Sequence, residues 1–160
     1  MSADRNDDGV QFRLAVDADL PAVAALTERA YAPYTEAFGA PPLPVTEDYA
    51  PHIADGGVWL LEISGETAGL LVLEREPGYL MIFSVAVAPE FQGRGLGLKL
   101  LVFADEKARE AGYREVRLYT NARMERNIAL YSRYGYRETA RRAHPERAGW
   151  IIVDMARDLG

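Results

Sequence analysis

A strand, a glycine-rich loop and a helix follow one another in the middle of the sequence, and this succession strongly limits the folds open to the chain. The strand YLMIFSVAV (Tyr79–Val87) is nearly continuously apolar, so we expect it to be central in a sheet. The loop ends in FQGRGLG (Phe91–Gly97), and apolar residues at helical spacing predict a helix to about Ala111. Because REVRLYT (Arg114–Thr120) has the pattern of another strand, the succession predicts a right-handed parallel crossover.

The flanking segments predict further strands and helices. Val10–Val16 alternates like a half-buried strand, and a helix capped by Asp17 or Asp19 is expected to follow it. From Tyr31 to Asp55 the sequence is rich in proline, aromatic and acidic residues, which predicts an irregular region that can include short helices. Periodicity and turn residues predict the remaining elements: strands over Val58–Ser64, Thr67–Glu76, about Tyr136–Arg141 and about Trp150–Ala156, and a helix over Met124–Tyr134.

These elements predict an α/β (α+β) fold with one mixed, mostly antiparallel central sheet of about seven strands, flanked by helices on both faces. We expect a single domain over residues 10–160, preceded by a flexible N-terminal tail over residues 1–9. The sequence has no apolar run of about 18 residues and no apolar signal segment at its start. We therefore expect a cytoplasmic protein with no membrane partner.

The composition restricts the chemistry further. The chain has no cysteine, which excludes disulfides, thiolate zinc sites and a cysteine nucleophile. Its formal net charge of −6 argues against a nucleic-acid partner and is compatible with cationic substrates, although ordinary solubility also explains it. We expect no metal and either a monomer or a homodimer.

The loop FQGRGLG has the features of an anion site. Unpaired N–H groups at a helix N-terminus favour phosphates, glycine lets a ligand approach the backbone, and Arg94 adds positive charge. The alternative is that the glycines only form a tight turn. The dinucleotide fingerprint and the P-loop both fail to match, which disfavours a nucleotide-binding module. What remains is the pattern Q-x-x-G-x-G, formed by Gln92, Gly95 and Gly97.

This loop resembles the acetyl-coenzyme A binding motif of the GNAT superfamily of N-acetyltransferases. The order of the predicted elements is that of the GNAT fold. NIALYSRYGYRE (Asn127–Glu138) is similar to the family's second cofactor segment, a helix with Asn and Tyr that ends at a Gly-aromatic pair. The resemblance spans about Val10 to Leu159, which is essentially the whole domain.

The resemblance implies acetyl-CoA as cosubstrate and assigns roles to individual residues. The main chain of Val85, Ala86 and Val87 is expected to pair with the pantetheine arm where the family's strand splays apart. Asn127 is expected to contact the cofactor. Tyr131, four residues later on the same helix, is expected to donate a proton or a hydrogen bond to the departing thiolate. The expected phosphate loop consists of Gln92, Gly93, Arg94, Gly95, Leu96, Gly97 and Leu98, with the N–H groups of about Arg94 to Leu98 holding the pyrophosphate.

The expected function is transfer of an acetyl group from acetyl-CoA to a primary amine, on a small molecule or a peptide, by direct attack in a ternary complex. The alternative is a non-catalytic acyl-CoA binding or sensing domain. No residue stands out as the general base. His52 and His144 have the context of solvated loop residues, and Ser84 could only position a water. Tyr31, Tyr34, Glu36 and Phe38 lie where members of the family often build an acceptor pocket. The alternative, favoured for each residue taken singly, is that the aromatic side chains only anchor this segment by burial.

Overall fold

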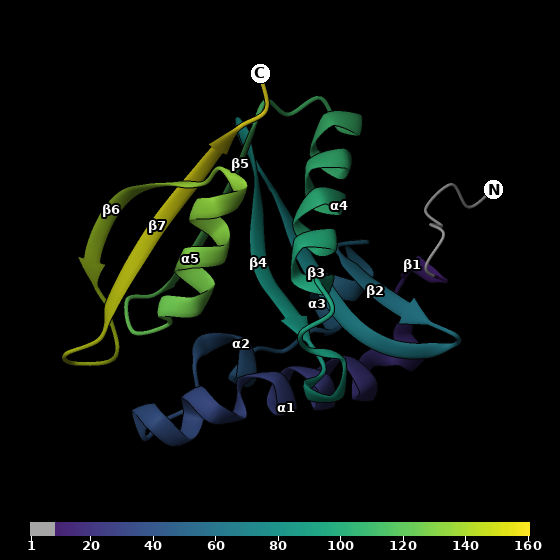
Figure 1. Cartoon of the computed structure of the whole chain (residues 1–160), viewed down its shortest axis with the longest axis horizontal. Helices are drawn as coiled ribbons and strands as arrows, with labels where there is room; N and C mark the ends of the chain where they lie inside the picture. Colours follow the sequence, from purple (N-terminus) through teal and green to yellow (C-terminus); the bar gives the residue numbers. More distant parts are fainter. Residues whose placement is uncertain (1–8) are drawn as a thin grey trace. The chain divides into compact units, whose positions relative to one another are not determined.

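The computed structural model describes residues 9–160, and its strands form one seven-stranded sheet in the order β1-β2-β3-β4-β5-β7-β6 (Figure 1). The predicted tail over residues 1–9 lies outside the described residues except for Gly9. The pairs β1–β2, β2–β3, β5–β7 and β6–β7 are antiparallel, and β4–β5 is parallel. The mixed, mostly antiparallel sheet and the parallel crossover between β4 and β5 are therefore confirmed.

The elements lie close to their predicted positions. The strands are β1 (Val10–Leu14), β2 (Val58–Ile63), β3 (Glu66–Glu76), β4 (Tyr79–Val87), β5 (Glu115–Asn121), β6 (Arg137–Ala143) and β7 (Ile151–Asp158). The α-helices are α1 (Leu20–Phe38), α2 (Leu43–Thr46), α3 (Ala50–Ala54), α4 (Leu96–Glu110) and α5 (Glu125–Tyr134), and two 3-10 turns are η1 (Asp17–Asp19) and η2 (Pro89–Phe91). Among residues 9–160, none of the helices has the length and apolarity needed to cross a membrane.

The described residues form two compact units, each with its own core. Unit 1 consists of residues 9–74 together with Ser84–Leu100. Its strands β1, β2 and β3 form an antiparallel meander, and the turn between β2 and β3 lies at Ser64 and Gly65, which both have positive φ. The fully buried side chains of this unit include Val23, Val58, Leu60, Leu61, Leu70, Leu71 and Leu100.

Helix α1 of unit 1 is longer than predicted, and the expected irregular region from Tyr31 is wrong at its start. The helix continues through Pro33 to Phe38 and ends at Gly39, whose φ is +77°. Pro33 removes one backbone donor and crowds the preceding turn, yet Tyr31, Tyr34 and Phe38 keep the helical spacing. The ring centroids of Tyr31 and Tyr34 are 6.3 Å apart, and those of Tyr34 and Phe38 are 5.7 Å apart. Aromatic contacts therefore continue along the helix on both sides of the proline.

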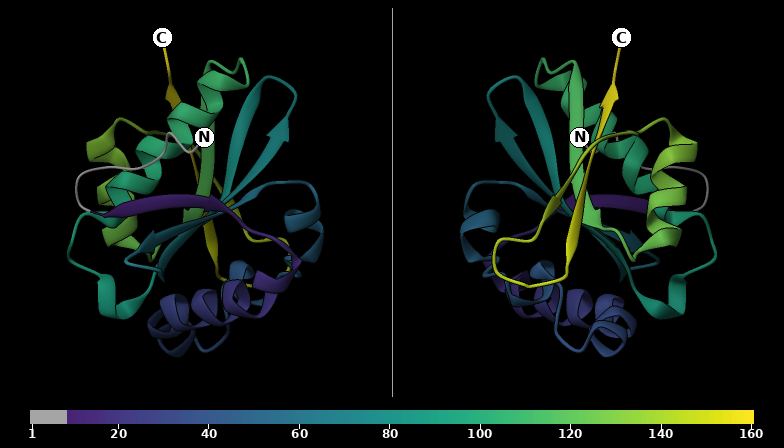
Figure 2. Two further views of the ribbon diagram at one scale, coloured as in Figure 1. Left: turned by 90° about the vertical axis from the view of Figure 1, so that its right-hand side faces the viewer. Right: turned by 90° about the vertical axis from the view of Figure 1, so that its left-hand side faces the viewer.

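Unit 2 consists of Arg75–Phe83 together with Leu101–Gly160. Its parallel ladder joins β4 to β5 from Leu80–Val116 to Ile82–Leu118. On the other side of β5, β7 pairs antiparallel with both β5 and β6, and Figure 2 shows the resulting β6–β7 hairpin in olive and yellow. The buried apolar residues of this unit include Phe103, Ala104, Ala108, Val116, Leu118, Val153 and Met155.

Candidate functional site

The glycine-rich loop of unit 1 is open on the side of its glycines. Gly93 and Gly95 have φ values of +83° and +76°, a conformation that favours glycine over every other residue. A Cβ atom built at either position would meet no atom within 4 Å. The backbone conformation alone therefore explains these two glycines, and the space beside them also leaves room for a ligand to approach the main chain.

The predicted phosphate loop is divided between a turn and a helix. Gln92, Gly93, Arg94 and Gly95 precede α4, while Leu96, Gly97 and Leu98 form its first turn. The N–H of Lys99 donates to the carbonyl of Gly95 at 3.2 Å, the first bond of the helix, so the three N–H groups before it lack helical partners. Leu96 is buried and Leu98 is 44% exposed, so Leu96 can offer a ligand only its main chain.

Two side chains of the loop have defined contacts. The Arg94 guanidinium lies over the ring of Phe91, with Cζ 5.0 Å from the ring centroid, while Arg94 itself stays exposed. Gln92 turns back and donates from Nε2 to the carbonyl of Val87 at 3.2 Å. The guanidinium therefore supplies a positive charge beside the N-terminus of α4, whereas the Gln92 amide is engaged with β4.

The segment of β4 predicted to hold the pantetheine arm continues beyond the parallel ladder. That ladder covers Leu80 to Ile82, whereas β4 runs to Val87. Ala86 is buried, and Val85 and Val87 are half-buried. The phenol of Tyr31 donates to the carbonyl of Val85 at 3.3 Å. This strand end therefore has side-chain partners from α1 and from the loop, and sequence reasoning gave no sign of either contact.

Hydroxyl groups gather beside this strand end in unit 1. Tyr49 is 2% exposed and donates to the carbonyl of Pro44 at 2.5 Å. Burial raises the pKa of both Tyr31 and Tyr49, and the nearby Ser84 hydroxyl opposes that rise in each case. The Ser84 Oγ is buried and has no hydrogen-bond partner of good geometry within residues 9–160. Both phenols therefore stay protonated at neutral pH and act as donors.

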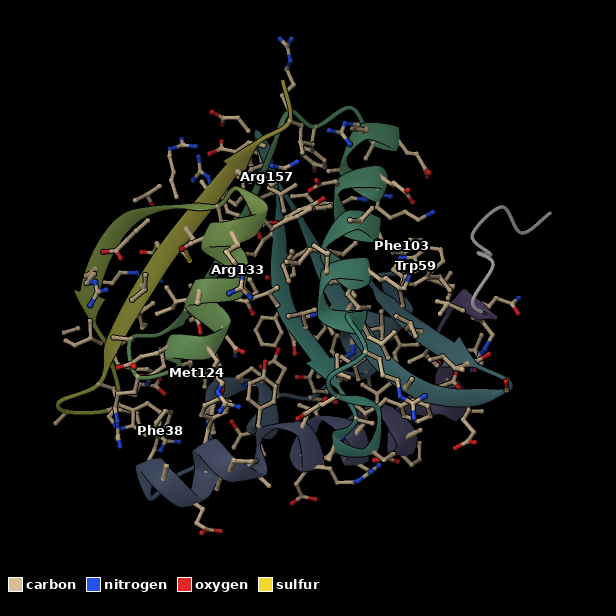
Figure 3. All side chains as sticks on the ribbon, in the orientation of Figure 1. Phe38, Trp59, Phe103, Met124, Arg133 and Arg157 are labelled. Atoms are coloured by element: carbon tan, nitrogen blue, oxygen red, sulfur yellow. The ribbon has the colours of Figure 1, made fainter. Side chains whose placement is uncertain are left out.

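Unit 2 holds the two remaining predicted site residues on α5, which begins just after Met124 and carries Arg133, both labelled in Figure 3. Tyr131 is buried, and its ring meets that of Tyr136 edge-on with centroids 6.1 Å apart. Asn127 is half-buried, and its Nδ2 donates to the Met124 sulfur at 3.9 Å. The structure thus brings Asn127 and Tyr131 together on one helix, as their spacing predicted.

A buried ion pair anchors the C-terminal end of α5. Asp105 of α4 is 1% exposed and accepts hydrogen bonds from the Tyr134 hydroxyl at 2.6 Å and from Arg157 Nε at 2.9 Å. Arg157 also donates to the carbonyl of Tyr134 at 3.1 Å. Burial, helped by Asp105, raises the pKa of Tyr134 to about 12. Sequence reasoning missed this cluster, although an aspartate between Leu101 and Ala108 on the apolar helix face was a signal for a buried partner.

His52 is not the solvated loop residue that the sequence suggested. It lies on α3 with its side chain 11% exposed, and its Nε2 is 2.8 Å from Glu47 Oε2. Its Nδ1 is 3.9 Å from Glu74 Oε2 on β3. The short helix α3 removes this imidazole from solvent, so His52 connects the α2–α3 segment to the sheet. His144 does lie in the loop between β6 and β7, where its Nδ1 accepts the N–H of Glu146.

The loop fits a bound pyrophosphate better than a metal ion. Its donors are the N–H groups of the first turn of α4 and the exposed guanidinium of Arg94, with open space beside Gly93 and Gly95. Across the described part of the chain, no group of three or more His, Cys, Asp or Glu residues is placed to hold a metal ion.

Comparison with known proteins agrees with the geometry. Residues 23–136 match the model of the Acetyltransferase (GNAT) family. An uncharacterized N-acetyltransferase of Escherichia coli, YjgM, is 32% identical over 82 residues, which are 49% of each chain. This chain spans about half the length of the curated relatives it matches.

Solved structures share the fold. The ribosomal-protein-S18-alanine N-acetyltransferase of Escherichia coli has a TM-score of 0.74 at 22% identity, covering 94% of both chains. A GNAT family acetyltransferase of Elizabethkingia anophelis, solved with acetyl-CoA bound, has a TM-score of 0.73 at 22% identity, covering 96% of this chain and all of that one. With the family model matching most of its length, the chain belongs to the GNAT family of acetyltransferases.

Proposed function

We propose that this protein transfers an acetyl group from acetyl-CoA to a primary amine by direct attack in a ternary complex. The observation that carries the proposal is the open glycine loop at the N-terminus of α4, in a chain of the GNAT family. The absence of cysteine from the sequence agrees with direct transfer, because a thiol acyl-enzyme cannot form.

The loop binds the cofactor through its main chain. The first-turn N–H groups of α4 and the helix dipole favour the pyrophosphate, and Arg94 adds a charge-assisted contact. The turn before α4 is formed by Gln92, Gly93 and Gly95. The N–H groups that bind the pyrophosphate come from Leu96, Gly97 and Leu98. Asn127 and the main chain of Val85 and Val87 hold the rest of the cofactor, whereas the carbonyl of Ala86, predicted to take part, faces β3.

The bound cofactor supplies an activated acetyl thioester. The neutral amine attacks the thioester carbonyl carbon, so an N–C bond forms while the C–S bond breaks and its electron pair goes to sulfur. The ammonium first loses one proton to water or a base. After the attack the nitrogen loses a second proton, which passes through solvent to the thiolate and gives the free CoA thiol. Tyr131 donates a hydrogen bond to the departing thiolate, since full proton transfer from an ordinary tyrosine, pKa near 10, to a thiolate whose acid has a pKa near 8.5 is uphill by about 2 kcal/mol.

The acceptor amine binds near the end of α1, where the rings of Tyr31, Tyr34 and Phe38 lie in tilted contact. These rings suit a cationic amine. Glu36 is two residues from both Tyr34 and Phe38, so it does not lie on their face of the helix. One of the structural relatives is named for an alanine of ribosomal protein S18, so a peptide N-terminus joins small amines as a candidate. We further propose a cytoplasmic protein without nucleic-acid partners, a single functional domain over residues 10–160, and a monomer or homodimer.

A panel of small amines and peptides, incubated with acetyl-CoA while free thiol release is followed, tests the activity. We expect transfer to at least one amine, and we expect acetyl-CoA at about a hundredfold excess over its Kd to add about 2.7 kcal/mol to the free energy of unfolding. Tight acetyl-CoA binding without transfer to any amine would favour the sensing domain. A calorimetric titration without binding at millimolar cofactor would contradict both.

A further inference from the structure

The peptide groups at the end of β4 alternate between two edges of the strand. A Cβ atom added to Gly69 on β3 would lie 3.0 Å from the carbonyl oxygen of Ala86, and the N–H of Ala88 donates to the carbonyl of Ala68 at 2.8 Å. The carbonyl of Ala86 and the N–H of Ala88 therefore face β3, while the Ala88 carbonyl accepts the N–H of Phe91 in η2. In an extended strand the groups of the intervening residues point the opposite way, so those of Val85 and Val87 face the other edge.

Both carbonyls on this other edge accept hydrogen bonds from side chains. The Tyr31 hydroxyl donates to Val85 at 3.3 Å and the Gln92 amide donates to Val87 at 3.2 Å. Neither donor belongs to a strand, and the ladder to β5 has already ended at Ile82. The N–H groups of Val85 and Val87 lie on this same edge of β4. Since both carbonyls already accept side-chain hydrogen bonds, the edge offers a ligand mainly hydrogen-bond donors.

Tyr31 is suited to be a permanent donor. It is 9% exposed, it sits on the buried face of α1, and burial raises the pKa of its phenol, so it stays protonated at neutral pH. Of the hydroxyls nearby, Thr27 donates to the carbonyl of Val23 and Tyr49 to that of Pro44. The Tyr31 hydroxyl, by contrast, donates to a main-chain carbonyl of β4.

We propose that Tyr31 is a positioning residue that caps the Val85 carbonyl, so that the edge of β4 presents N–H donors to the thioester carbonyl of acetyl-CoA. This inference rests on the proposed function. An uncapped Val85 carbonyl would place an unsatisfied, electron-rich oxygen on the edge that must bind another carbonyl oxygen. The cap removes that competition and also fixes the orientation of the Val85–Ala86 peptide.

The test compares two ligands that differ only in the acetyl group. We measure the Kd of acetyl-CoA and of CoA by calorimetry for the full chain, for Tyr31→Phe and for Thr27→Val, a control that removes another buried hydroxyl of the same helix, one bonded to the Val23 carbonyl. Tyr31→Phe should lower the preference for acetyl-CoA over CoA by about 3- to 10-fold, the value of one lost hydrogen bond. Thr27→Val should leave this preference unchanged. Because both ligands are titrated into the same preparation, the ratio cancels any loss of folded protein.

A spectroscopic measurement reports on the same bond directly. The carbonyl stretch of acetyl-CoA labelled with carbon-13 at its carbonyl should fall on binding to the unmodified protein and fall less on binding to Tyr31→Phe. An affinity ratio for Tyr31→Phe equal to that of the unmodified protein would overturn the proposal, whether both affinities are unchanged or fall equally, as they do when a hydroxyl is purely structural. An unchanged carbonyl stretch would also overturn it. Failure of the unmodified protein to bind either ligand would instead contradict the proposed function.

Discussion

Single residues of the loop differ in what their substitution can reveal. On the sequence alone, Gly95→Val is a clean test of phosphate approach, but the φ of +76° makes that interpretation wrong. A β-branched side chain at this position strains the backbone whether or not a ligand binds. Substitution of Arg94 avoids this problem. Its side chain is exposed, so removing it does not strain the backbone of the loop.

Arg94→Ala should weaken CoA binding by about 10- to 100-fold, the range for one hydrogen bond to a charged group. The loss should shrink as salt is raised, because the guanidinium is exposed and its interaction with the pyrophosphate is screened. Titration calorimetry at two ionic strengths measures both effects. The control is Arg75→Ala, which removes another exposed arginine from β3. Equal losses in the two variants would remove Arg94 from the phosphate site.

Tyr131→Phe should lower turnover by about 10- to 1,000-fold while acetyl-CoA affinity changes little, since a thioester sulfur is a poor acceptor before the C–S bond breaks. The ring that packs against Tyr136 is retained, so the fold should be unaffected. Rates with the best amine, alongside direct titration of the cofactor, separate the two effects. Unchanged turnover with chemistry shown to be rate-limiting would leave water as the proton source.

At the level of elements, the ion pair between α4 and β7 determines how α5 ends. Arg157 donates to the Tyr134 carbonyl at the last residue of α5, and its Cζ lies 4.4 Å from the centroid of the Tyr134 ring. Gly135 follows with a φ of +117°, and a Cβ atom there would be 2.5 Å from Arg157 Nη1. The backbone conformation therefore favours glycine at this position, and a side chain there would also displace the Arg157 guanidinium.

Asp105→Ala should lower the free energy of unfolding by about 3 to 5 kcal/mol, because it leaves the Arg157 charge without its buried partner. Replacing both residues together, as in Asp105→Leu with Arg157→Met, should recover much of that loss. Urea unfolding curves measure the difference. Glu138→Ala, which breaks the exposed pair with Arg141, is the control and should change stability little. A loss in the double variant as large as in Asp105→Ala would show that the pair itself is stabilising.

The sequence predicted the elements well and their side-chain partners poorly. Periodicity and glycines located β4, α4 and α5 because these signals are local. The bond from Tyr31 to Val85 joins residues far apart in the sequence, and no local pattern announces it. The prediction ended α1 too early because of Pro33. A proline can either end a helix or be tolerated inside it, and the sequence alone does not distinguish the two cases. Residues of a recognisable loop motif could therefore be predicted. Side-chain hydrogen bonds from a distant helix, such as that from Tyr31 to Val85, depend on how the chain folds in three dimensions.

At the scale of the whole molecule, buried phenols limit stability at high pH. Tyr134 has a pKa of about 12 in the folded chain, above the ordinary value of 10.0, chiefly because it is shielded from solvent. Burial also raises the pKa of Tyr31, Tyr49 and Tyr136. Between the two values the unfolded chain binds fewer protons than the folded one, so stability decreases as pH rises through this range.

The stabilising effect of Tyr134 protonation should thus be complete below about pH 10 and lost as pH rises towards about 12. Urea unfolding at a series of alkaline pH values should show this decline, and Tyr134→Phe should make it shallower. Ultraviolet titration of tyrosinate in native and denatured protein identifies the groups responsible. A native titration that coincides with the denatured one would contradict the prediction.

The order of the strands has a consequence for synthesis on the ribosome. Strand β7 follows both of its neighbours in the sequence, yet it lies between β5 and β6 in the sheet. Unit 1 has all of its described residues once Leu100 has emerged from the ribosome, whereas β5 and β6 are made before the strand that pairs with both of them. A chain that stopped before Ile151 would therefore carry the glycine-rich loop and α5 but lack the strand that joins β5 to β6.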